Sequence, residues 1–492
     1  MSYCGYVTNL KNIRKHPNAD LLVLANCFEN TVCVKKDLFV EGQLVVYFPT
    51  DGQLSMEFCE KNGLLAVYEN GVNVSGGYMD PTKRNVRAIK LRGEQSDGLC
   101  LPLDCLAYTG VDLTSLTPGF PIETVNGHEI CRKFIPVAKI PKTVAGGAGK
   151  RVKRRAKRSI APQFFEHKDT EQLQYNLSVF KPGDQIEITR KLHGTSGRTS
   201  YTRVLQDGKY SLADHEFKSL LLKVMPSGKW KDRLIEKWCN PVYEYGHVSG
   251  TRRTVLDTYD GGFYGSNEFR EQYHKFFEGK LWKGETVYYE IVGFTHDGTP
   301  IMGVCSNEKL KDKEFVKKYG KTTLFSYGCE PHPVAGSADP NNPDATFAAK
   351  PQSRIFVYRM TMTNEDGEVV EYTPEFMRYR CMYMGVEPVP VEWSGTIPPE
   401  EVFTGTSCEY TDPGEFVLAK AEEFYDGPEP LDPRHIREGV VVRIVNRPTF
   451  TAYKHKNFNF KVLEGIIKDT ATAPDMEEAD GLDEEDTESG AV

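Results

Sequence analysis

The sequence contains no run of 18 or more apolar residues, no apolar signal core near its start and no internal repeat. A helix that crosses a bilayer needs about 20 mostly apolar residues, so a membrane span is excluded. The opening stretch MSYCGYVTNLKNIRKHP also lacks the apolar region of a secretory signal. We therefore expect a cytoplasmic protein that acts without a membrane partner.

Paired cysteines are also lacking. The 12 cysteines are scattered along the chain, and no two of them form a CxxC pair. This spacing argues against a zinc ribbon and is typical of reduced thiols in the cytosol.

Charge is distributed unevenly. The formal net charge is −8, yet the last 18 residues alone contain nine Asp or Glu and no Lys or Arg. We expect an acidic, disordered tail over residues 469–492, because this segment has almost nothing to bury. Residues 150–158, KRVKRRAKR, carry seven Lys or Arg within a predicted basic linker over 136–165. That run is either a solvated connector or a contact for the phosphate backbone of a nucleic acid.

The first 135 residues predict a small β-barrel. Segments such as TVCVKKDLFV, GQLVVYFP and NVRAIKL mix β-branched, aromatic and polar residues, and Gly, Pro and Asp separate them. Several short strands at this spacing are typical of an OB-like barrel over residues 1–135.

Residues 166–468 predict a larger α+β domain built on antiparallel sheets with flanking helices. Alternating segments predict strands, whereas EFVLAKAEEF predicts a helix. The predicted strands cover 185–191, 285–294, 322–328, 353–360 and 439–445. The segments 329–351 and 386–414 are rich in Pro, Gly and Asp, so we expect surface insertions there.

The segment ITRKLHGTSGR, residues 188–198, is the first that suggests chemistry. Lys191 ends a predicted strand, and Gly194 and Gly197 follow it. A desolvated lysine near other cations becomes a nucleophile, and Gly-rich backbone lets a phosphate approach closely. Taken alone, a Lys-x-x-Gly is more typical of a turn.

The order of the segments that follow strengthens the case. A strand supplies Glu290, an aromatic strand supplies Phe356, and Glu438 precedes an apolar strand. Lys454 and Lys456 are two residues apart, so a strand would point both to one face. Together these residues can bind a nucleotide and its metal and form a covalent phosphoramide.

This order resembles the covalent nucleotidyltransferase superfamily of polynucleotide ligases and mRNA capping enzymes, over about residues 165–465. KLHG at 191–194 differs from the Lys-x-Asp-Gly of DNA ligases and capping enzymes. His193 in that slot resembles the branch that contains phage RNA ligase 2 and the RNA-editing ligases. GTRRTVL (250–256) resembles the Arg-containing motif of that branch but lies further downstream, which implies an insertion at about 205–245.

The N-terminal half resembles the Deinococcus/Naegleria-type RNA ligases, which place an OB-like domain before the nucleotidyltransferase domain. The similarity rests on KLRGEQSDGLCLPL (90–103), followed by the basic linker and ITRKLHGT. The usual Ser-Gln-Gly-Leu stands here as Ser96-Asp97-Gly98-Leu99.

The resemblance implies an ATP-dependent RNA ligase, expected to be a monomer, that seals 3′-OH and 5′-phosphate RNA ends, including those of a nicked duplex. Lys191 would form a lysyl-AMP, and the AMP would pass to the RNA 5′-phosphate before the 3′-OH displaces it. The resemblance also implies roles for the other residues. Lys454 and Lys456 would neutralise phosphate charge, Glu438 would bind Mg²⁺ or Mn²⁺ through water, and Glu290 would contact the ribose or a second metal. Phe356 would stack on adenine, His193 and Gly194 would contact the nucleotide, and Arg252 or Arg253 would contact AMP or the RNA end.

Two alternatives stay open from the sequence. A DNA ligase or a GTP-using capping enzyme is disfavoured by KLHG and because only 36 residues follow Lys456. A non-catalytic RNA-binding OB protein would use the basic run and residues such as Tyr78, Lys90 and Arg92. HPNADLL (16–22) is similar to a segment of tRNA-binding OB domains. Such a binder would not need Lys191, Glu290, Glu438 and the lysine pair together.

Overall fold

The computed structural model describes residues 3–70, 72–134, 160–212, 239–256, 267–339, 342–347, 349–404 and 410–469, together with residue 259 and a few residues between 221 and 234. Most of the predicted basic linker and acidic tail therefore lies outside the described residues. Within these ranges, no helix is both long enough and apolar enough to cross a membrane.

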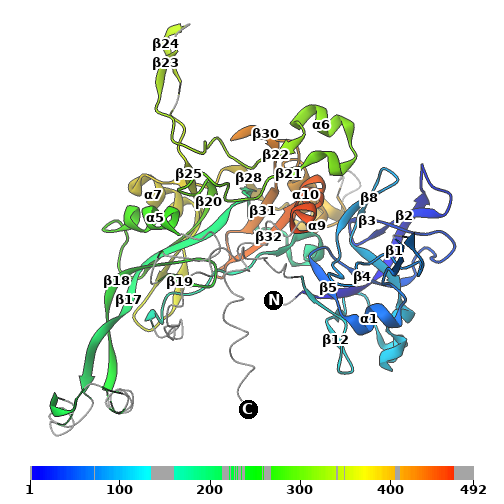
Figure 1. Ribbon diagram of the computed structural model, residues 1–492, viewed down its shortest axis with the longest axis horizontal. Coiled ribbons are helices and arrows are strands. Elements are labelled where there is room, and N and C mark those ends of the chain that lie inside the picture. The colour runs from blue at the N-terminus through cyan, green and yellow to red at the C-terminus, as the bar shows by residue number, and fades with distance from the viewer. Residues whose placement is uncertain are drawn as a thin grey trace.

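The N-terminal residues form a curled antiparallel sheet that is buried on both faces (Figure 1). Alternate residues of one central strand enter two different cores: Val45 and Tyr47 pack with the inside of the curl, and Val46 and Phe48 pack beneath a short helix. The strand order is β10-β4-β1-β2-β3, with β11 beside β1. The elements are β1 (Gly5–Lys15), β2 (Leu22–Cys27), β3 (Asn30–Lys35), β4 (Leu44–Phe48), β10 (Leu99–Pro102), β11 (Pro121–Ile122) and α1 (Met56–Lys61).

The HPNADLL segment stabilises this curled sheet through hydrogen bonds. His16 is fully buried, and its Nε2 lies 3.1 Å from the carbonyl oxygen of Leu91. The Asn18 backbone N–H donates to His16 Nδ1, and the Asn18 side chain donates to the Arg92 carbonyl. The segment thus joins the loop after β1 to the hairpin of β8 (Ala88–Leu91) and β9 (Glu94–Asp97).

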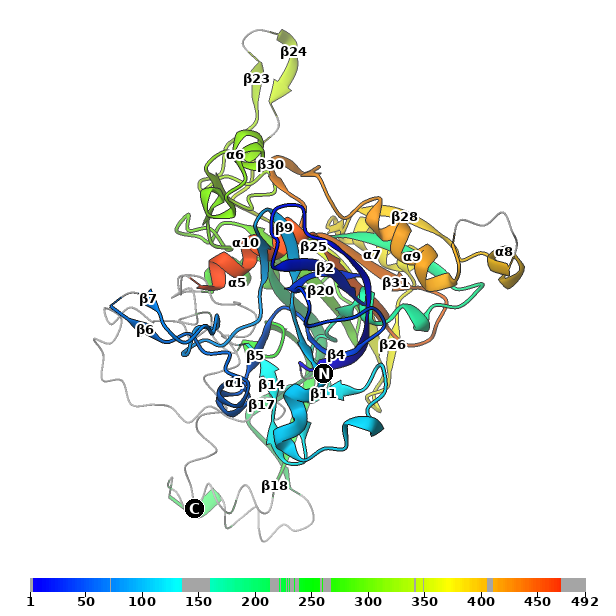
Figure 2. The same cartoon turned by 90° about the vertical axis from the view of Figure 1, so that its right-hand side faces the viewer.

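Among the described residues that follow, two larger sheets dominate, and helices cover their outer faces (Figures 1 and 2). The five-stranded sheet has the order β15-β32-β31-β16-β28, and the seven-stranded sheet has the order β19-β18-β17-β20-β25-β26 with β27 beside β25. The strands of the first sheet are β15 (Glu171–Gln172), β16 (Gln185–Lys191), β28 (Val391–Thr396), β31 (Gly439–Ile444) and β32 (Thr451–Lys456). Those of the second are β17 (Thr195–Leu212), β18 (Cys239–Gly250), β19 (Val255–Leu256), β20 (Glu285–Gly293), β25 (Ser353–Thr363), β26 (Val369–Glu371) and β27 (Glu387–Pro388).

The outer faces have separate cores. Ile186 and Ile188 of β16 pack with Val417 of α9 (Pro413–Glu422), whereas α5 (Glu268–Phe277) and α7 (Pro374–Met384) cover the seven-stranded sheet. Strands β17 and β18 extend beyond the sheet as a long arm, at lower left in Figure 1. The described part of the chain also contains α6 (Lys313–Tyr319), α8 (Glu400–Thr404) and α10 (Phe458–Asp469). The short strands used below are β5 (Gly52–Leu54), β14 (Cys131–Lys133), β22 (Thr322–Thr323), β29 (Pro428–Glu429) and β30 (Asp432–Ile436).

Two sequence-based expectations were wrong. Only Thr322 and Thr323 of the strand predicted over 322–328 have a pairing partner, the short strand Cys305–Ser306, so the strand ends there. The chain then turns at Tyr327 and Gly328, whose φ angles are 49° and 78°. The segment 386–414 is not simply a surface insertion, since its Val391–Thr396 forms β28 and pairs with β16. The predicted strand at 185–191 and the helix near 415–424 are confirmed.

The N-terminal domain is tied to the larger sheets by polar contacts and by a tyrosine cluster. Asp97 pairs with Lys461 of α10, and Lys90 pairs with Asp312 at 2.9 Å. Tyr175, which precedes β16, contacts the rings of Tyr6, Phe28 and Tyr47. These contacts place the curled sheet beside the inner faces of the two larger sheets.

A fully buried ion pair fixes α7 to the seven-stranded sheet. Glu285 and Arg380 are both completely buried, and Arg380 donates two hydrogen bonds of 2.8 and 2.6 Å to the carboxylate. The Tyr372 hydroxyl and the Trp282 backbone N–H also donate to Glu285. Loss of this one carboxylate would leave the Arg380 charge buried without compensation.

We therefore expect Glu285→Ala to lower the free energy of unfolding by about 3–5 kcal/mol, because removal of one member of a buried ion pair leaves the charge of the other buried and uncompensated. Urea unfolding of the full chain would measure this change. Glu308→Ala is the control, since Glu308 is 60% exposed and lies 3.7 Å from its nearest partner, Lys321. Equal stability of the two variants would contradict the prediction.

Candidate active site

A cavity of about 800 Å³ lies between the inner faces of the two larger sheets and the N-terminal domain. The five-stranded sheet contributes Lys191, Lys454 and Lys456 to its wall, and the seven-stranded sheet contributes Glu290. The N-terminal domain adds residues from its first strand, from the loop before β5 and from β14. One cavity thus collects side chains that are far apart in the sequence.

Lys191 lies at the end of β16, where the strand register pairs it with Gly439. Its Nζ is 2.8 Å from Glu438 Oε1, and its side chain is 24% exposed to the cavity. Gly439 is required here: its φ is +147°, and a Cβ would lie 2.1 Å from the His455 carbonyl oxygen. A larger residue would push β31 away from β32 and separate Glu438 from the lysines.

Opposite charges alternate around Glu438. Lys456 Nζ lies 3.4 Å from Glu438 Oε1 and within 3.0 Å of both carboxylate oxygens of Glu464 on α10. Glu438 is 1% exposed, so two ammonium groups compensate a carboxylate that has almost no contact with water. This arrangement holds the ends of β16, β31 and β32 together.

Lys454 is in a different electrostatic position. Burial, followed by the charges of Lys456 and Lys191, lowers the pKa of Lys454 to about 8. The lysine therefore changes charge within two pH units of neutrality, whereas an ordinary lysine titrates near pH 10.4. An anion in the cavity would restore the full positive charge of Lys454.

His193 is neutral at pH 7, because burial lowers its pKa to about 4. Its ring lies edge-on between Phe325 and Phe460, with centroid distances of 4.9 and 4.8 Å. The 3.8 Å separation between His193 Nδ1 and Glu438 Oε2 is therefore not an ion pair in the neutral protein. His193 packs the floor beneath the lysine rather than adding charge to it.

Backbone contacts align the turn after Lys191. The Gly194 N–H donates to Glu290 Oε1 at 3.0 Å, and the His193 N–H donates to the Tyr327 hydroxyl at 2.6 Å. A Cβ on Gly194 would lie 2.3 Å from the Ile291 carbonyl oxygen. Glycine at this position allows the start of β17 to approach β20 until Glu290 faces the cavity.

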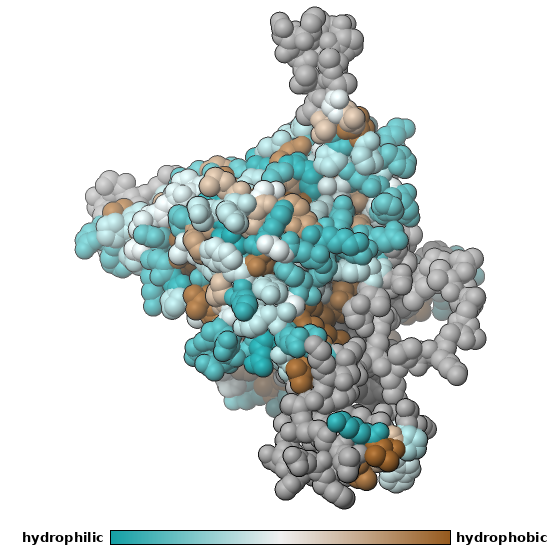
Figure 3. Space-filling view, turned by 90° about the vertical axis from the view of Figure 1, so that its left-hand side faces the viewer, coloured by the Kyte–Doolittle hydropathy of each residue, from teal (hydrophilic) through white to brown (hydrophobic). Residues whose placement is uncertain are grey.

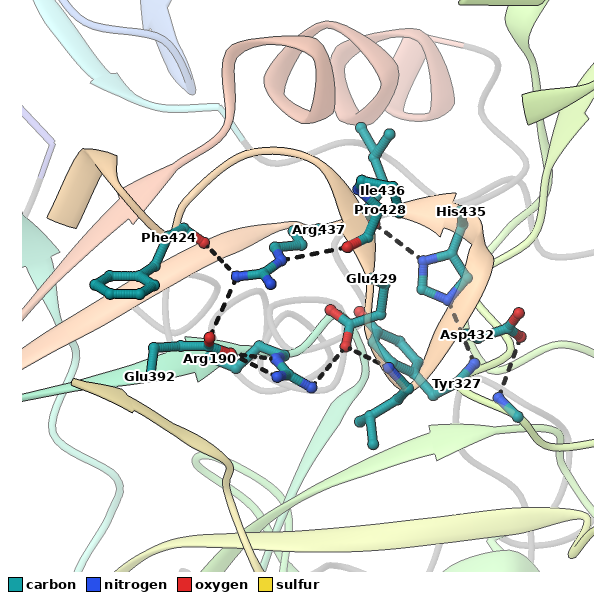
Figure 4. A network of polar contacts seen from close by, with 12 residues as sticks. Arg190, Tyr327, Glu392, Phe424, Pro428, Glu429, Asp432, His435, Ile436 and Arg437 are labelled. Atoms are coloured by element: carbon teal, nitrogen blue, oxygen red, sulfur yellow. Dashed lines mark hydrogen bonds and ion pairs between the residues drawn. The ribbon is translucent and has the colours of Figure 1, made fainter. Parts of the chain in front are cut away.

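A buried network behind the sheet anchors the residue before the nucleophile candidate (Figure 4). Arg190 donates to Glu392 of β28 and, at 2.9 Å, to Glu429, which is fully buried. Arg437 lies 3.4 Å from Glu392 and donates to the Phe424 carbonyl. Successive side chains of a strand point to opposite faces, so these contacts hold the Arg190 side chain on one face of β16 and leave Lys191 on the other.

The structure separates the two candidate arginines. Arg252 lines the cavity, is 21% exposed and lies 3.1 Å from Asp169. Arg253 is 49% exposed, lies 3.7 Å from the same carboxylate and is not part of the cavity wall.

Phe356 is not brought to the cavity either. It is fully buried in a hydrophobic cluster with Leu192 and Val292. Tyr358, two residues further along β25, does line the cavity, and its hydroxyl lies 3.4 Å from His167 Nδ1. Of these two rings, Tyr358 is the one a ligand could reach.

Sequence reasoning missed several residues of the cavity wall. Arg443 could have been found, because it is the inward-facing charge at the end of the apolar strand GVVVR. Asp51 and Lys133 come from the N-terminal domain, and no pattern in the sequence links them to Lys191. Glu464 follows Lys456 by eight residues on a separate helix, and only its 2.8 Å contact reveals the pairing.

The carboxylates suit a hydrated divalent cation better than a closed metal cage. Among the described residues, no three His, Cys, Asp or Glu side chains cluster closely enough to hold a metal ion. Glu438 Oε2 is buried and has no hydrogen-bond partner within the described chain, so it can accept one from a metal-bound water. Mg²⁺ and similar ions often bind to one or two carboxylates and keep most of their water.

Comparisons with known proteins agree with this architecture. A family model described as an OB-fold domain matches residues 5–103. No curated protein matches the sequence. Among solved structures, Naegleria gruberi RNA ligase is similar: a lysine-to-methionine mutant with AMP and Mn gives a TM-score of 0.51 at 15% identity and covers 93% of this chain and 97% of that chain. A lysine-to-alanine mutant of the same ligase with ATP and Mn gives a TM-score of 0.51 at 15% identity, and the match covers 93% of this chain and 98% of that chain.

The chain shares the α+β fold of these RNA ligases. A glutamate-to-alanine mutant of the same ligase with ATP and Mn has a similar fold. Its TM-score is 0.50 at 14% identity, and the match covers 93% of this chain and 98% of that chain. The expected OB-like N-terminal domain and the expected fold class are confirmed. The predicted domain boundaries stay a prediction.

Competitive labelling of lysines with acetic anhydride tests the electrostatics of the cavity. We expect Lys454 to reach half of its maximal reactivity near pH 8, since only the neutral amine reacts. Lys456→Gln removes a neighbouring cation and should shift this midpoint upward. Peptide mass spectrometry measures each lysine separately, and the 82% exposed Lys321 is the internal control. A midpoint near 10 for Lys454 in the unmodified protein would contradict the prediction.

Proposed function

We propose that the protein is an ATP-dependent RNA ligase that joins 3′-OH and 5′-phosphate RNA ends. The observation that carries this proposal is the position of Lys191 Nζ, 2.8 Å from the buried Glu438, in a cavity that also receives Lys454 and Lys456. The shared fold supports it, because the similar Naegleria gruberi RNA ligase structures contain ATP or AMP together with Mn.

In the first step, the Lys191 ammonium group releases a proton to solvent, and the resulting amine attacks the α-phosphorus of ATP. The bond between that phosphorus and the pyrophosphate oxygen breaks, and the nitrogen releases a second proton to solvent as the phosphorus–nitrogen bond forms. Glu438 holds the amine in place through the 2.8 Å contact, so its free rotation is restricted before the reaction. The products are lysyl-AMP and pyrophosphate.

In the second step, a 5′-phosphate oxygen of the RNA attacks the same phosphorus and the Lys191 amine leaves. In the third, the RNA 3′-OH attacks the 5′-phosphate phosphorus, a 3′–5′ phosphodiester forms and AMP leaves. Each step is a displacement at phosphorus, for which positioning and charge neutralisation supply most of the catalysis.

Lys454 and Lys456 neutralise the charge that develops on the α-phosphate. Lys456 is already held by Glu438 and Glu464 and acts as a fixed positive charge. Lys454, whose pKa lies near 8, gains its full charge when the phosphates enter. Arg252 and Arg443 stand further along the wall and would contact AMP or the RNA end.

Bound Mg²⁺ or Mn²⁺ would neutralise phosphate oxygens, and Glu438 and Glu290 are the residues that would hold it. The orphaned Glu438 Oε2 supports a contact through water. Glu290 also accepts from the Gly194 N–H, so the same carboxylate fixes the turn after Lys191.

The proposal includes a cytoplasmic setting. The ten cysteines whose side chains the structure describes are all free thiols, as in proteins of reducing compartments.

Lys191→Met should abolish formation of the AMP adduct, because no amine attacks ATP. Incubation with α-labelled ATP, or separately GTP, and a divalent ion, followed by a denaturing gel, measures the adduct. The same variant should still seal RNA that already carries a 5′-adenylyl group, since the third step does not use the amine. That second readout distinguishes a lost nucleophile from a misfolded protein.

Labelling of the unmodified protein by GTP rather than ATP would favour a capping enzyme. Sealing of DNA ends in preference to RNA ends would favour a DNA ligase. Absence of label with either nucleotide and either metal, with RNA binding retained, would overturn the ligase proposal in favour of a binding protein.

The adenine-stacking residue is tested by a matched pair of variants. Tyr358→Ala should raise the KM for ATP about tenfold with a smaller effect on kcat, because stacking on a base contributes about 1–3 kcal/mol. Phe356→Leu should leave the KM unchanged and lower the thermal midpoint, because Phe356 is core. Steady-state adenylylation rates measure both. A raised KM for Phe356→Leu alone would instead support Phe356 as the stacking residue.

A further inference from the structure

The outer side of α7 carries exposed aromatic side chains. Figure 3 looks onto the side of the molecule where α5 and α7 lie. On α7, Phe376, Tyr379 and Tyr383 are 38%, 53% and 68% exposed, and Trp282, just before β20, is 46% exposed. We call these four residues the aromatic strip.

The rings of the strip are arranged as a platform. The Phe376 and Tyr379 rings are nearly parallel, with an interplanar angle of 15° and centroids 6.1 Å apart. Trp282 lies 6.2 Å from Phe376. Arg380 stacks on Trp282 at 3.8 Å and is held by the buried Glu285, so the platform has a rigid support.

Lysines stand beside the strip. Lys283 follows Trp282, and its Nζ lies 5.2 Å from the centre of the Tyr245 ring on the arm strand β18. Lys280 Nζ lies 3.3 Å from the Phe276 ring centre. Lys280 Nζ also donates a hydrogen bond of 3.1 Å to the Met384 carbonyl oxygen at the end of α7. Neither lysine makes an ion pair with a carboxylate among the described residues, so no carboxylate there compensates either charge.

This composition is not what a helix needs to close a core. Met377 and Cys381 already fill the inward side of α7. The outward side of a surface helix is ordinarily charged or polar, and contiguous exposed apolar surface commonly marks a binding site. Exposed rings next to lysines are the pattern by which proteins bind single-stranded nucleic acids, with bases on the rings and phosphates near the cations.

We propose that the aromatic strip binds a single-stranded stretch of RNA outside the cavity. The proposal rests on the function proposed above and adds a second contact for the same substrate. Lys280 and Lys283 would contact the phosphates, and Tyr379 and Tyr383 would stack on bases.

The position of α7 connects the strip to the active site. Met377 of the same helix lines the cavity, and Arg378 pairs at 2.6 Å with Glu187 of β16, which also lines it. A helix is about 10 Å across, so the strip lies roughly that far from the cavity wall. An RNA strand whose end is in the cavity would reach the strip within a few nucleotides.

RNA fits the surface better than a protein partner does. Lysine is depleted at the centre of protein–protein interfaces, whereas this strip is bordered by Lys283, next to Trp282 in the sequence, and by Lys280, which is bonded to the end of α7. Phosphates compensate such charges at every nucleotide, and the tyrosine faces accept any base without sequence preference.

Fluorescence anisotropy with a labelled single-stranded RNA, without ATP, tests the proposal. Tyr379→Ala/Tyr383→Ala should raise the Kd about tenfold or more, because each stacked base contributes about 1–3 kcal/mol. Lys283→Ala should lower the slope of log Kd against log salt by about 0.7. The control Tyr68→Ala/Val74→Ala removes side chains that are 64% and 53% exposed on the N-terminal domain and should leave the Kd unchanged.

The double variant should lose no affinity for an abasic strand or a blunt duplex, since neither presents bases for stacking. It should also form the AMP adduct at the normal rate, because the strip lies outside the cavity. An unchanged Kd, or an equal loss on abasic and ordinary RNA, would overturn the proposal. Sedimentation that shows a dimer for the unmodified protein and a monomer for the double variant would assign the strip to self-association instead. Failure of the ligase function would appear as a missing AMP adduct, independently of these binding data.

Discussion

The Glu438 carboxylate is the centre on which the site depends. It is almost completely buried, and Lys191 and Lys456 approach it from two different strands. A buried carboxylate is unfavourable unless cations compensate it, so the folded state requires both lysines to be where catalysis would use them. Glu464 extends the same alternation of charge to the C-terminal helix. Stability and the proposed reactivity therefore rest on one set of contacts.

Backbone geometry makes this charge cluster attainable. Gly439 lies where β31 meets β32, and Gly194 lies where β17 begins to pair with β20. A side chain at either position would collide with a carbonyl oxygen. The buried pairs behind the sheet, above all Arg190 with Glu392 and Glu429, hold the opposite face of β16. Lys191 is therefore presented by a rigid strand rather than by a loop.

Much of the fold was predictable from local pattern. The alternation in QIEITRK defines β16 to the residue, and the two-residue spacing of Lys454 and Lys456 places both at the cavity. Patterns failed where tertiary contacts decide. The proline-rich composition hid β28, whose pairing with β16 is long-range, and the aromatic run around Phe356 did not reveal which ring faces inward. Asp51, Lys133 and Glu464 reach the site only through packing between distant elements, for which the sequence has no period or motif.

The position of β16 between β28 and β31 has a consequence for synthesis of the chain. Both neighbours lie about 200 residues or more further along: Gln185 pairs with Thr396, and Lys191 pairs with Gly439. Ribosomes add about 5–20 residues per second, so β16 waits many seconds without either partner. The N-terminal curl, whose strands lie close together in the sequence, can fold during that interval. The cavity cannot form before β31 and β32 have been synthesised, and ribosomal products that stop before residue 438 would contain Lys191 without the glutamate that holds it.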